Sequence, residues 1–268
     1  MRRWGVVFAY CGAGMLGACS LFTPLDGYTQ DTTASPADAG GTDEDAGAPD
    51  VDASSSDSAA SVDASLDYPE TVLLDGPIAY YRLGDPGNVA KDEVGRRHGT
   101  YKQQGSHAPG AIVGDDDTAA VFNGEGFVDL GDDFGFLGTV PYSIEAWVSV
   151  GKVGGTWCLF AKNAASVASE GPNAGYAMYF MDSPRVRFVR YGNLAEDSAI
   201  SSPLPEDTFT HVVGTYDGEV LTVYIDGEFD ASGRSQRPVE PVPNAFTIGA
   251  SRGGTTCYFR GQVDELAI

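Results

Sequence analysis

Glycine and proline interrupt this chain so often that long regular elements are excluded over most of it. The 268 residues include 35 Gly and 15 Pro. From residue 72 to the end, only the stretch 156–170 runs for more than twelve residues without one of them. In a helix interior, Gly costs about 1 kcal/mol and Pro about 3 kcal/mol relative to Ala. A helical bundle is therefore excluded, and short strands joined by turns are expected.

Ten short runs rich in β-branched and aromatic residues lie between these turn signals. Asp226-Gly227 and Asp217-Gly218 each mark a tight hairpin. Apolar and charged residues alternate over 185–188, as in a strand with one face in water. Ten strands in 198 residues predict an all-β sandwich or barrel. The runs are 77–83, 118–122, 142–150, 156–161, 176–181, 185–191, 209–216, 220–225, 245–250 and 256–268.

Charge is unevenly distributed and marks the first boundary. The chain carries a net charge of −22, which excludes nucleic acid as a main partner. Residues 26–70 contain 12 acidic and no basic residues, whereas 71–268 contain 26 acidic and 14 basic ones, a net of −12. The first stretch also has few large apolar side chains, so it cannot offset the entropy of ordering. We expect residues 19–70 to form a disordered, acidic Ser/Ala/Asp/Gly-rich tether, followed by one domain over 71–268.

The N-terminus indicates export. Arg2 and Arg3 form a basic region, and the apolar segment 5–18 is shorter than the roughly 20 residues that span a bilayer. It ends in Leu-Gly-Ala-Cys at 16–19, which resembles the lipobox of bacterial lipoproteins. The resemblance implies a lipoprotein signal peptide over 1–18 and a diacylglyceryl group on Cys19. The alternative is an ordinary signal peptide with a chance cysteine. We expect a protein anchored in the cell envelope, at the outer membrane or cell surface.

Two cysteines remain for the folded domain. Cys158 and Cys257 both lie in strand-like segments that are candidates for neighbouring positions in a sheet. In an oxidising compartment such a pair predicts one disulfide. The alternative, two separate buried thiols, stays open. The chain has no Cys/His spacing typical of structural zinc.

Seven short segments carry a family resemblance. Together, and in this order, they resemble laminin G-like, concanavalin A-like lectin/glucanase jelly-roll domains of exported bacterial proteins. They cover nearly the whole of 71–268. The segments are IAYYRLG at 78–84, RHGTY at 97–101, AVFNG at 120–124, YSIEAWV at 142–148, HVVGTYDG at 211–218, YIDG at 224–227 and FRGQVDEL at 259–266.

The resemblance implies an antiparallel two-sheet jelly-roll sandwich whose concave sheet often bears a ligand site. It also implies a structural calcium ion, because Asp264 matches an aspartate on the last strand that holds calcium in the similar β-glucanase sandwiches. The alternative for Asp264 is an exposed or hydrogen-bonded carboxylate. Such domains usually continue past the Val-Asp-Glu strand, whereas this sequence stops at Ile268.

Catalysis is not expected. The similar glucanases carry three carboxylates at alternating positions on one strand, and that pattern does not occur here. The run 142–150 offers only Glu145, and we expect the adjacent Asp264 and Glu265 to lie on opposite faces. There is no Gly-x-Ser-x-Gly motif. His98, His107 and His211 are predicted to be neither catalytic nor metal ligands.

Aromatic rings are the usual apolar platform for sugars. The candidates are Trp157, Tyr179, Tyr191 and the pair Arg187 and Arg190, although core packing or a solvated strand face is the favoured explanation for each of them. The sequence therefore assigns no ligand-binding residue.

The function expected from these observations is binding without chemistry. We expect a cell-surface lipoprotein whose domain binds carbohydrate or a protein partner. The alternatives are a structural or adhesive envelope component without glycan binding, and an accessory subunit of a secreted glycoside hydrolase.

Overall fold

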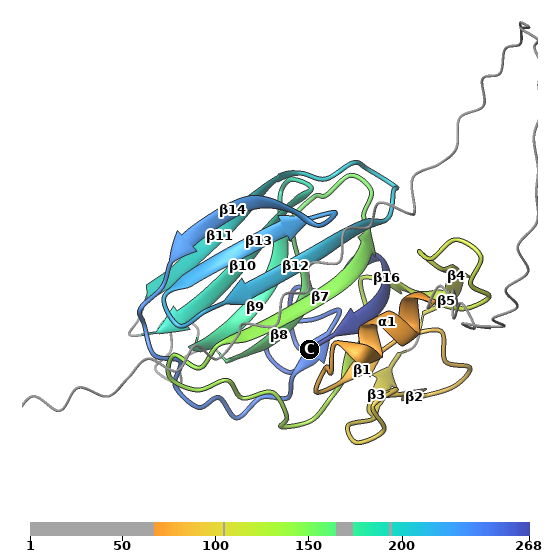
Figure 1. Ribbon diagram of the computed structural model, residues 1–268, viewed down its shortest axis with the longest axis horizontal. Coiled ribbons are helices and arrows are strands. Elements are labelled where there is room, and N and C mark those ends of the chain that lie inside the picture. Colours follow the sequence, from red (N-terminus) through yellow and green to blue (C-terminus); the bar gives the residue numbers. More distant parts are fainter. Residues whose placement is uncertain (1–66, 104, 165–173, 193–194) are drawn as a thin grey trace, which may run out of the picture.

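The computed structural model describes residues 67–103, 105–164, 174–192 and 195–268. The signal peptide, Cys19 and the tether up to residue 66 lie outside these ranges, so the expectations about them stay predictions. The described residues form two antiparallel sheets packed face to face (Figure 1). This arrangement confirms the predicted all-β, two-sheet jelly-roll sandwich.

The first sheet, sheet A, carries the last strand of the chain near its middle. All its strand pairs are antiparallel. In spatial order it contains β14 (Glu228–Arg234), β13 (Val220–Ile225), β12 (Thr210–Tyr216), β7 (Tyr142–Ser149), β16 (Arg260–Ala267), β5 (Thr118–Asn123) and β4 (His107–Pro109), with β1 (Tyr80–Tyr81) paired to β16.

The second sheet, sheet B, is built around four long neighbouring strands. Its strand pairs are antiparallel as well. In spatial order it contains β11 (Ala195–Pro203), β10 (Arg185–Gly192), β9 (Ala174–Met181), β8 (Thr156–Ala164), β15 (Thr247–Ile248), β6 (Phe127–Asp129), β3 (Gly99–Lys102) and β2 (Val89–Ala90).

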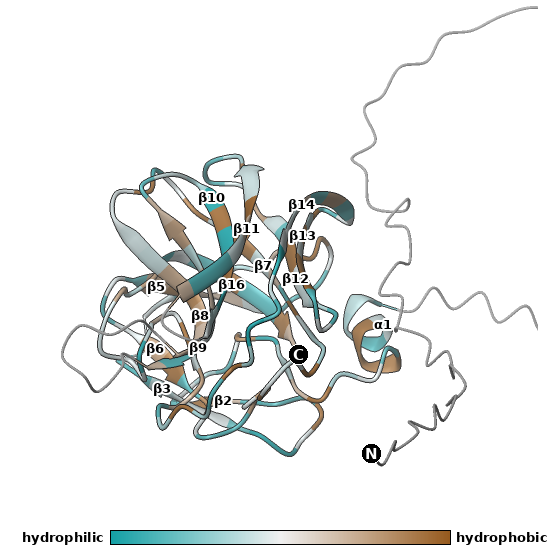
Figure 2. Cartoon of the chain, turned by 90° about the vertical axis from the view of Figure 1, so that its left-hand side faces the viewer, coloured by the Kyte–Doolittle hydropathy of each residue, from teal (hydrophilic) through white to brown (hydrophobic). Residues whose placement is uncertain are grey.

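The core fills the space between the sheets, because alternate residues of each strand point inward. Along β7, Ile144, Ala146 and Val148 are buried in it, and along β9 so are Met178 and Phe180. Hydrophobic and hydrophilic residues alternate visibly along β10 in Figure 2. The hydrophobic effect over this layer is the main stabilising contribution.

Within the described ranges there is one short helix, α1 (Tyr68–Leu74), which precedes the first strand. Asp67 caps its N-terminus by accepting a hydrogen bond from the Glu70 amide at 2.9 Å. The helix buries Val72 against Tyr80 on the outer side of sheet A. The expected boundary at residue 71 therefore falls inside a helix that packs on the domain. No helix among the described residues has the length and apolar character to cross a membrane.

Several strands differ from the runs that the sequence predicts. Only Tyr80–Tyr81 of the run 77–83 is a strand, and Leu83, with a φ of 69°, turns the chain away from the sheet. The run 245–250 forms only Thr247–Ile248. The short strands β2, β3, β4 and β6 and the polar strands β11 and β14 have no matching run, because few or no apolar residues mark them.

Cys158 and Cys257 are neighbours, as the sequence predicts. The amide of Cys158, in β8, donates a 2.8 Å hydrogen bond to the carbonyl of Cys257. Cys257 also packs against the small cluster that contains Cys158. The structure holds both as free thiols, so it does not contain the expected disulfide bond, which stays a prediction.

In the exported protein we predict that these two thiols are oxidised to one bond. It would close a loop of about 100 residues, which chain-entropy models value at ~4.7 kcal/mol of unfolding free energy. Peptide mapping without reductant should recover the two cysteines in one linked pair of peptides. Free thiols at both positions in unreduced protein would contradict this.

Candidate functional site

A β-bulge on the last strand brings two acidic side chains together. The register of β16 against β7 shifts between Asp264 and Ala267, and Glu265 has a φ of 51°. The expectation that Asp264 and Glu265 lie on opposite faces is therefore wrong, because the bulge breaks the alternation of the strand. With Asp117 they form a group whose ligand oxygens all lie within 4.8 Å of one another.

Glu265 is a carboxylate enclosed by protein. Its side chain is only 1% exposed. It accepts a hydrogen bond from the Tyr80 hydroxyl, and its Oε1 lies 3.1 Å from Nε of Arg82. Burial, with a smaller contribution from Asp67, raises the pKa of Glu265 to about 8, whereas the guanidinium of Arg82 acts in the opposite direction.

Asp264 is equally buried but has one unsatisfied oxygen. Its Oδ2 accepts a 2.7 Å hydrogen bond from the Ala111 amide, whereas its Oδ1 has no partner. Burial raises the pKa of Asp264 to about 6, although the hydrogen bond from Ala111 lowers it. An unpaired buried carboxylate oxygen costs free energy, so this atom is where a cation would stabilise the fold most.

Arg82 supplies the positive charge at the site. Its Nη2 lies 2.6 Å from a carboxylate oxygen of Asp115, and its Nε lies 3.2 Å from Asp117 Oδ2 and 3.1 Å from Glu265 Oε1. Asp115, Asp117 and Glu265 thus share one guanidinium, whereas Asp264 has no ion pair with it. The group keeps an excess of negative charge unless protons or a cation neutralise it.

The donor set fits calcium, which takes six to eight oxygen ligands including carboxylates and backbone carbonyls. Asp264 Oδ1 has no protein partner and would be the first ligand. Asp117 and Glu265 would join it only by releasing Nε of Arg82, which lies 3.2 Å and 3.1 Å from their carboxylates. The loop at Gly110 lies tightly over the group: a Cβ at this position would lie 2.8 Å from the Asp117 carbonyl oxygen and 3.0 Å from Asp264 Oδ2. Only glycine leaves that carbonyl and carboxylate uncrowded.

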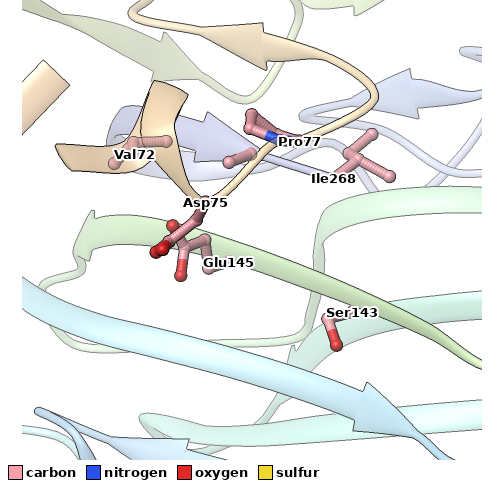
Figure 3. Close-up of a pocket in the computed structure, with 7 residues that line it drawn as sticks. Val72, Asp75, Pro77, Ser143, Glu145 and Ile268 are labelled. Atoms are coloured by element: carbon pink, nitrogen blue, oxygen red, sulfur yellow. The ribbon is translucent and has the colours of Figure 1, made fainter. Parts of the chain in front are cut away.

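A second acidic pair lies beneath α1. Asp75, just after the helix, and Glu145 on β7 point their carboxylates toward one another (Figure 3). Burial and the Glu145 charge raise the pKa of Asp75. They line a cavity of about 60 Å³ with Val72, Pro77, Ser143, Ala267 and Ile268. That volume suits water molecules and is far smaller than a ligand pocket of about 300 Å³ or more.

The three histidines occupy structural positions. His98 accepts a 3.0 Å hydrogen bond from the Asp92 amide. His211 packs against Trp147, with 5.2 Å between ring centroids. Its Nε2 lies 3.4 Å from Glu145 Oε2. His107 lies beside the Thr118 hydroxyl at 3.3 Å. None of the three lies in the Asp117, Asp264 and Glu265 group.

The aromatic candidates are mostly covered. Tyr179 and Tyr191 are buried on the outer side of sheet B, in the cluster around Cys158. Trp157 packs against the main core. Arg187 lies over the Tyr179 ring and pairs with Glu196. The Tyr179 and Tyr191 rings therefore lack the open face that a sugar needs, and Trp157 is only partly exposed.

Arg190 is fully buried between the two sheets. Its guanidinium lies 3.6 Å from the Tyr216 ring centroid, and its Nη2 donates a 2.7 Å hydrogen bond to the Gly138 carbonyl. This arginine therefore pins a loop within the core and is not available to a ligand.

Sequence reasoning identified Asp264 but missed its partners. Arg82 lies in the quoted segment 78–84 and Asp117 in an acidic run, yet neither carries a signal of proximity to β16. The predicted ligand Asp264 and the unpredicted Asp117 and Glu265 come together only through the fold.

The comparisons with solved structures are distant. Trypanosoma rangeli sialidase matches with 17% identity over 72% of this chain and 30% of that chain, at a TM-score of 0.49. Domain 4 of the GH43 extracellular arabinanase AbnA from Geobacillus stearothermophilus, in complex with arabinotriose, matches with 21% identity over 70% and 89% at 0.47. Domains LG4-5 of the mouse laminin alpha1 chain match with 12% identity over 55% and 40% at 0.42.

This chain thus spans about a third of the length of the sialidases that it matches. No curated protein matches its sequence. A family model, Laminin_G_3, matches residues 122–268, more than half of the chain. By this match, the chain belongs to the Laminin_G_3 family of the concanavalin A-like lectin/glucanases superfamily.

Proposed function

We propose that this chain is a cell-envelope lipoprotein displaying a laminin G-like domain that binds carbohydrate or a protein surface without cleaving it. The family description names lectins and glucanases, which bind or hydrolyse carbohydrate. The choice between these two activities depends on where the domain carries accessible carboxylates.

The observation that carries the proposal is the distribution of acidic residues over the sheets. The long strands β8, β9 and β10 of sheet B contain no Asp or Glu. The edge strand β11 contains Glu196 and Asp197, which pair with Arg187 and Arg237. On β16, Asp264 and Glu265 are each 1% exposed and so are enclosed by protein. Glycoside hydrolysis needs two carboxylates that flank a bound sugar, and neither arrangement offers them.

Anchoring completes the proposal. The lipobox-like segment places a diacylglyceryl group on Cys19, and the acidic tether carries the domain away from the membrane. A flexible coil of about 50 residues has an r.m.s. reach of ~40 Å, which charge repulsion extends further. Two acyl chains hold a protein at a membrane stably. Membrane contact is therefore through lipid, and the domain is free to reach ligands at the cell surface.

Calcium is the cofactor that we propose for the Asp264 site. The ion would neutralise charge that Arg82 leaves uncompensated and would satisfy the orphan Oδ1 of Asp264. Because the site joins β16 to the loop at Ala111, its role would be structural.

Removing calcium should lower the melting temperature of the full chain. We expect a chelator to shift it down by several degrees, equivalent to about 1–2 kcal/mol, and Asp264→Asn to abolish the difference between the calcium and chelator samples. Asp116→Asn, an exposed residue of the neighbouring loop, is the matched control and should behave as wild type. Equal melting temperatures for wild type with calcium and with chelator would contradict a structural calcium site.

Stability without calcium should depend on pH through Glu265. Its pKa in the folded state is raised from 4.5 to about 8, so between these values the folded state holds a proton that the unfolded state has released. The contribution of protonated Glu265 to the free energy of unfolding is then fully present below pH 4.5 and is lost as the pH rises through 8. In chelator, melting temperatures measured from pH 5 to pH 8.5 should fall in wild type and fall less in Glu265→Gln. Parallel curves for the two proteins would show that Glu265 is not the titrating group.

Binding without turnover is tested on the full chain in detergent micelles. On a panel of neutral and acidic polysaccharides we expect weak affinity, on the order of 10 μM to 1 mM, and no release of reducing sugar. Acidic polysaccharides should bind least, because residues 71–268 carry a net charge of −12.

Release of reducing sugar above a boiled-protein blank would overturn the non-catalytic assignment. Absence of binding to every glycan would leave the protein-partner form of the proposal, which affinity capture with purified envelope proteins then tests.

A further inference from the structure

A row of hydroxyl side chains crosses the outer face of sheet A. Register pairs Ser143 on β7 with Thr215 on β12, Thr215 with Thr222 on β13, and Thr222 with Ser232 on β14. Residues next to Ser143, Thr215 and Thr222 in sequence point into the core, so these three hydroxyls lie on the outer side. Ser232 is placed with them by its register with Thr222, and the neighbouring Gly233 faces the Ser198 carbonyl of sheet B. With strands spaced by about 4.8 Å, the row is about 14 Å long.

All four of these hydroxyl residues are accessible to solvent. All four residues are partly or fully exposed, and none of their side-chain oxygens is among the buried unsatisfied atoms. In the described part of the chain no hydrogen bond to another protein group is recorded for them. The hydroxyls of Thr215, Thr222 and Ser232 therefore face water and are available to a ligand with the same chemistry. Ser143, at the α1 end of the row, also lines the small cavity beneath that helix.

An aromatic pair borders the row. Register places Tyr224 on β13 opposite Phe229 on β14, and their rings meet edge to face with centroids 6.3 Å apart. Phe229 is 63% exposed. We call the four hydroxyl residues, Tyr224 and Phe229 the hydroxyl–aromatic face. In Figure 1 its strands, β14 to β12 and β7, face the viewer, with α1 lying beyond β7 toward β16.

The contact that α1 makes next to this face shows what the outer side of sheet A accepts. The Trp147 indole N–H donates a 2.9 Å hydrogen bond to the Tyr68 hydroxyl. The two rings meet edge to face with centroids 6.2 Å apart. A hydroxylated ring is therefore already bound by an aromatic side chain of β7, two residues from Glu145 and four from Ser143.

The charges at the rim select against anions. Asp217, Glu219 and Glu228 are exposed around the hairpin turns. The guanidinium of Arg234 lies 3.5 Å from Glu219 and is thus compensated. An acidic rim repels uronic acids, sulfated glycans and anionic lipid headgroups. The hydroxyl row is itself uncharged and matches an uncharged hydroxylated ligand.

We propose that the hydroxyl–aromatic face is the carbohydrate-docking surface of this domain and that its ligand is a neutral polysaccharide. The hydroxyl row bonds successive sugar hydroxyls, and Phe229 packs against the C–H face of one ring. The inference rests on the proposed function and deepens it, because it names the face and the class of glycan.

A protein interface fits this face less well. Stable interfaces bury about 800 Å² on each partner around an apolar centre. Among β7, β12, β13 and β14, all fully described, Phe229 is the one large apolar side chain counted as exposed. One ring among hydroxyl groups suits a sugar better than a second copy of the chain.

The test measures retention of the full chain, in detergent micelles, by gels containing a neutral polysaccharide: cellulose derivative, xylan, mannan or starch. Pectate is the anionic comparison. Phe229→Ala should weaken retention on the binding polysaccharide by about tenfold. Thr215→Val with Thr222→Val keeps side-chain shape while removing two hydroxyls and should weaken it similarly. Val113→Ala removes an apolar side chain that is 89% exposed in a distant loop, and it should leave retention unchanged.

Melting curves identify any variant that does not fold, and the isosteric double variant is expected to fold. If wild type is retained and the Phe229→Ala and Thr215→Val/Thr222→Val variants are retained as tightly as Val113→Ala, this assignment is overturned. The proposed function would remain intact. Retention on pectate in preference to the neutral gels would overturn the choice of ligand class. Absence of retention on every gel would reject both this inference and the carbohydrate form of the proposed function.

Discussion

The burial of two adjacent carboxylates on β16 is the constraint on which the rest of the structure depends. Asp264 and Glu265 lie near the end of the chain, yet every group that stabilises them comes from the beginning of the domain. Tyr80, Arg82 and the Ala111 amide must be in place before these oxygens lose water, because an uncompensated buried carboxylate is costly. The two ends of the domain are thereby tied together in the middle of sheet A.

The same constraint connects stability with chemistry. Desolvation raises the pKa of both carboxylates, so the group favours protons or a cation over bare charge. Substrates have no access to it. Such enclosed carboxylates are suited to strengthening the fold, and under the proposed function recognition falls to the outer faces of the sheets.

The two outer faces differ in what they offer. On sheet B, Tyr179 and Tyr191 are packed away with Cys158, so aromatic residues in strands were poor guides to a binding surface. On sheet A, register aligns hydroxyl residues that lie far apart in sequence. Because β12, β13 and β14 are consecutive antiparallel strands, most of the row follows from hairpin geometry, although its alignment with Ser143 on β7 requires the long-range pairing.

Sequence patterns predicted what depends on local physics. The hairpin at Asp226-Gly227 and the alternating strand 185–191 are observed, because turn chemistry and side-chain period are written into consecutive residues. The bulge at Glu265 could not be predicted, since a non-glycine residue at positive φ is held there by tertiary contacts. The family resemblance pointed to Asp264. Its proximity to Arg82, Asp117 and Glu265 could not be predicted, because it too arises from tertiary contacts.

Calorimetric titration of calcium into the full chain at pH 7, repeated in two buffers with different ionisation enthalpies, tests the central claim most directly. The account predicts binding at one site, loss of that binding in Asp264→Asn, and release of about one proton, because Glu265 must give up its proton to act as a ligand. Calcium binding without proton release would contradict the protonated state of Glu265. A titration with no heat in either buffer, and no change in melting temperature, would contradict the site itself.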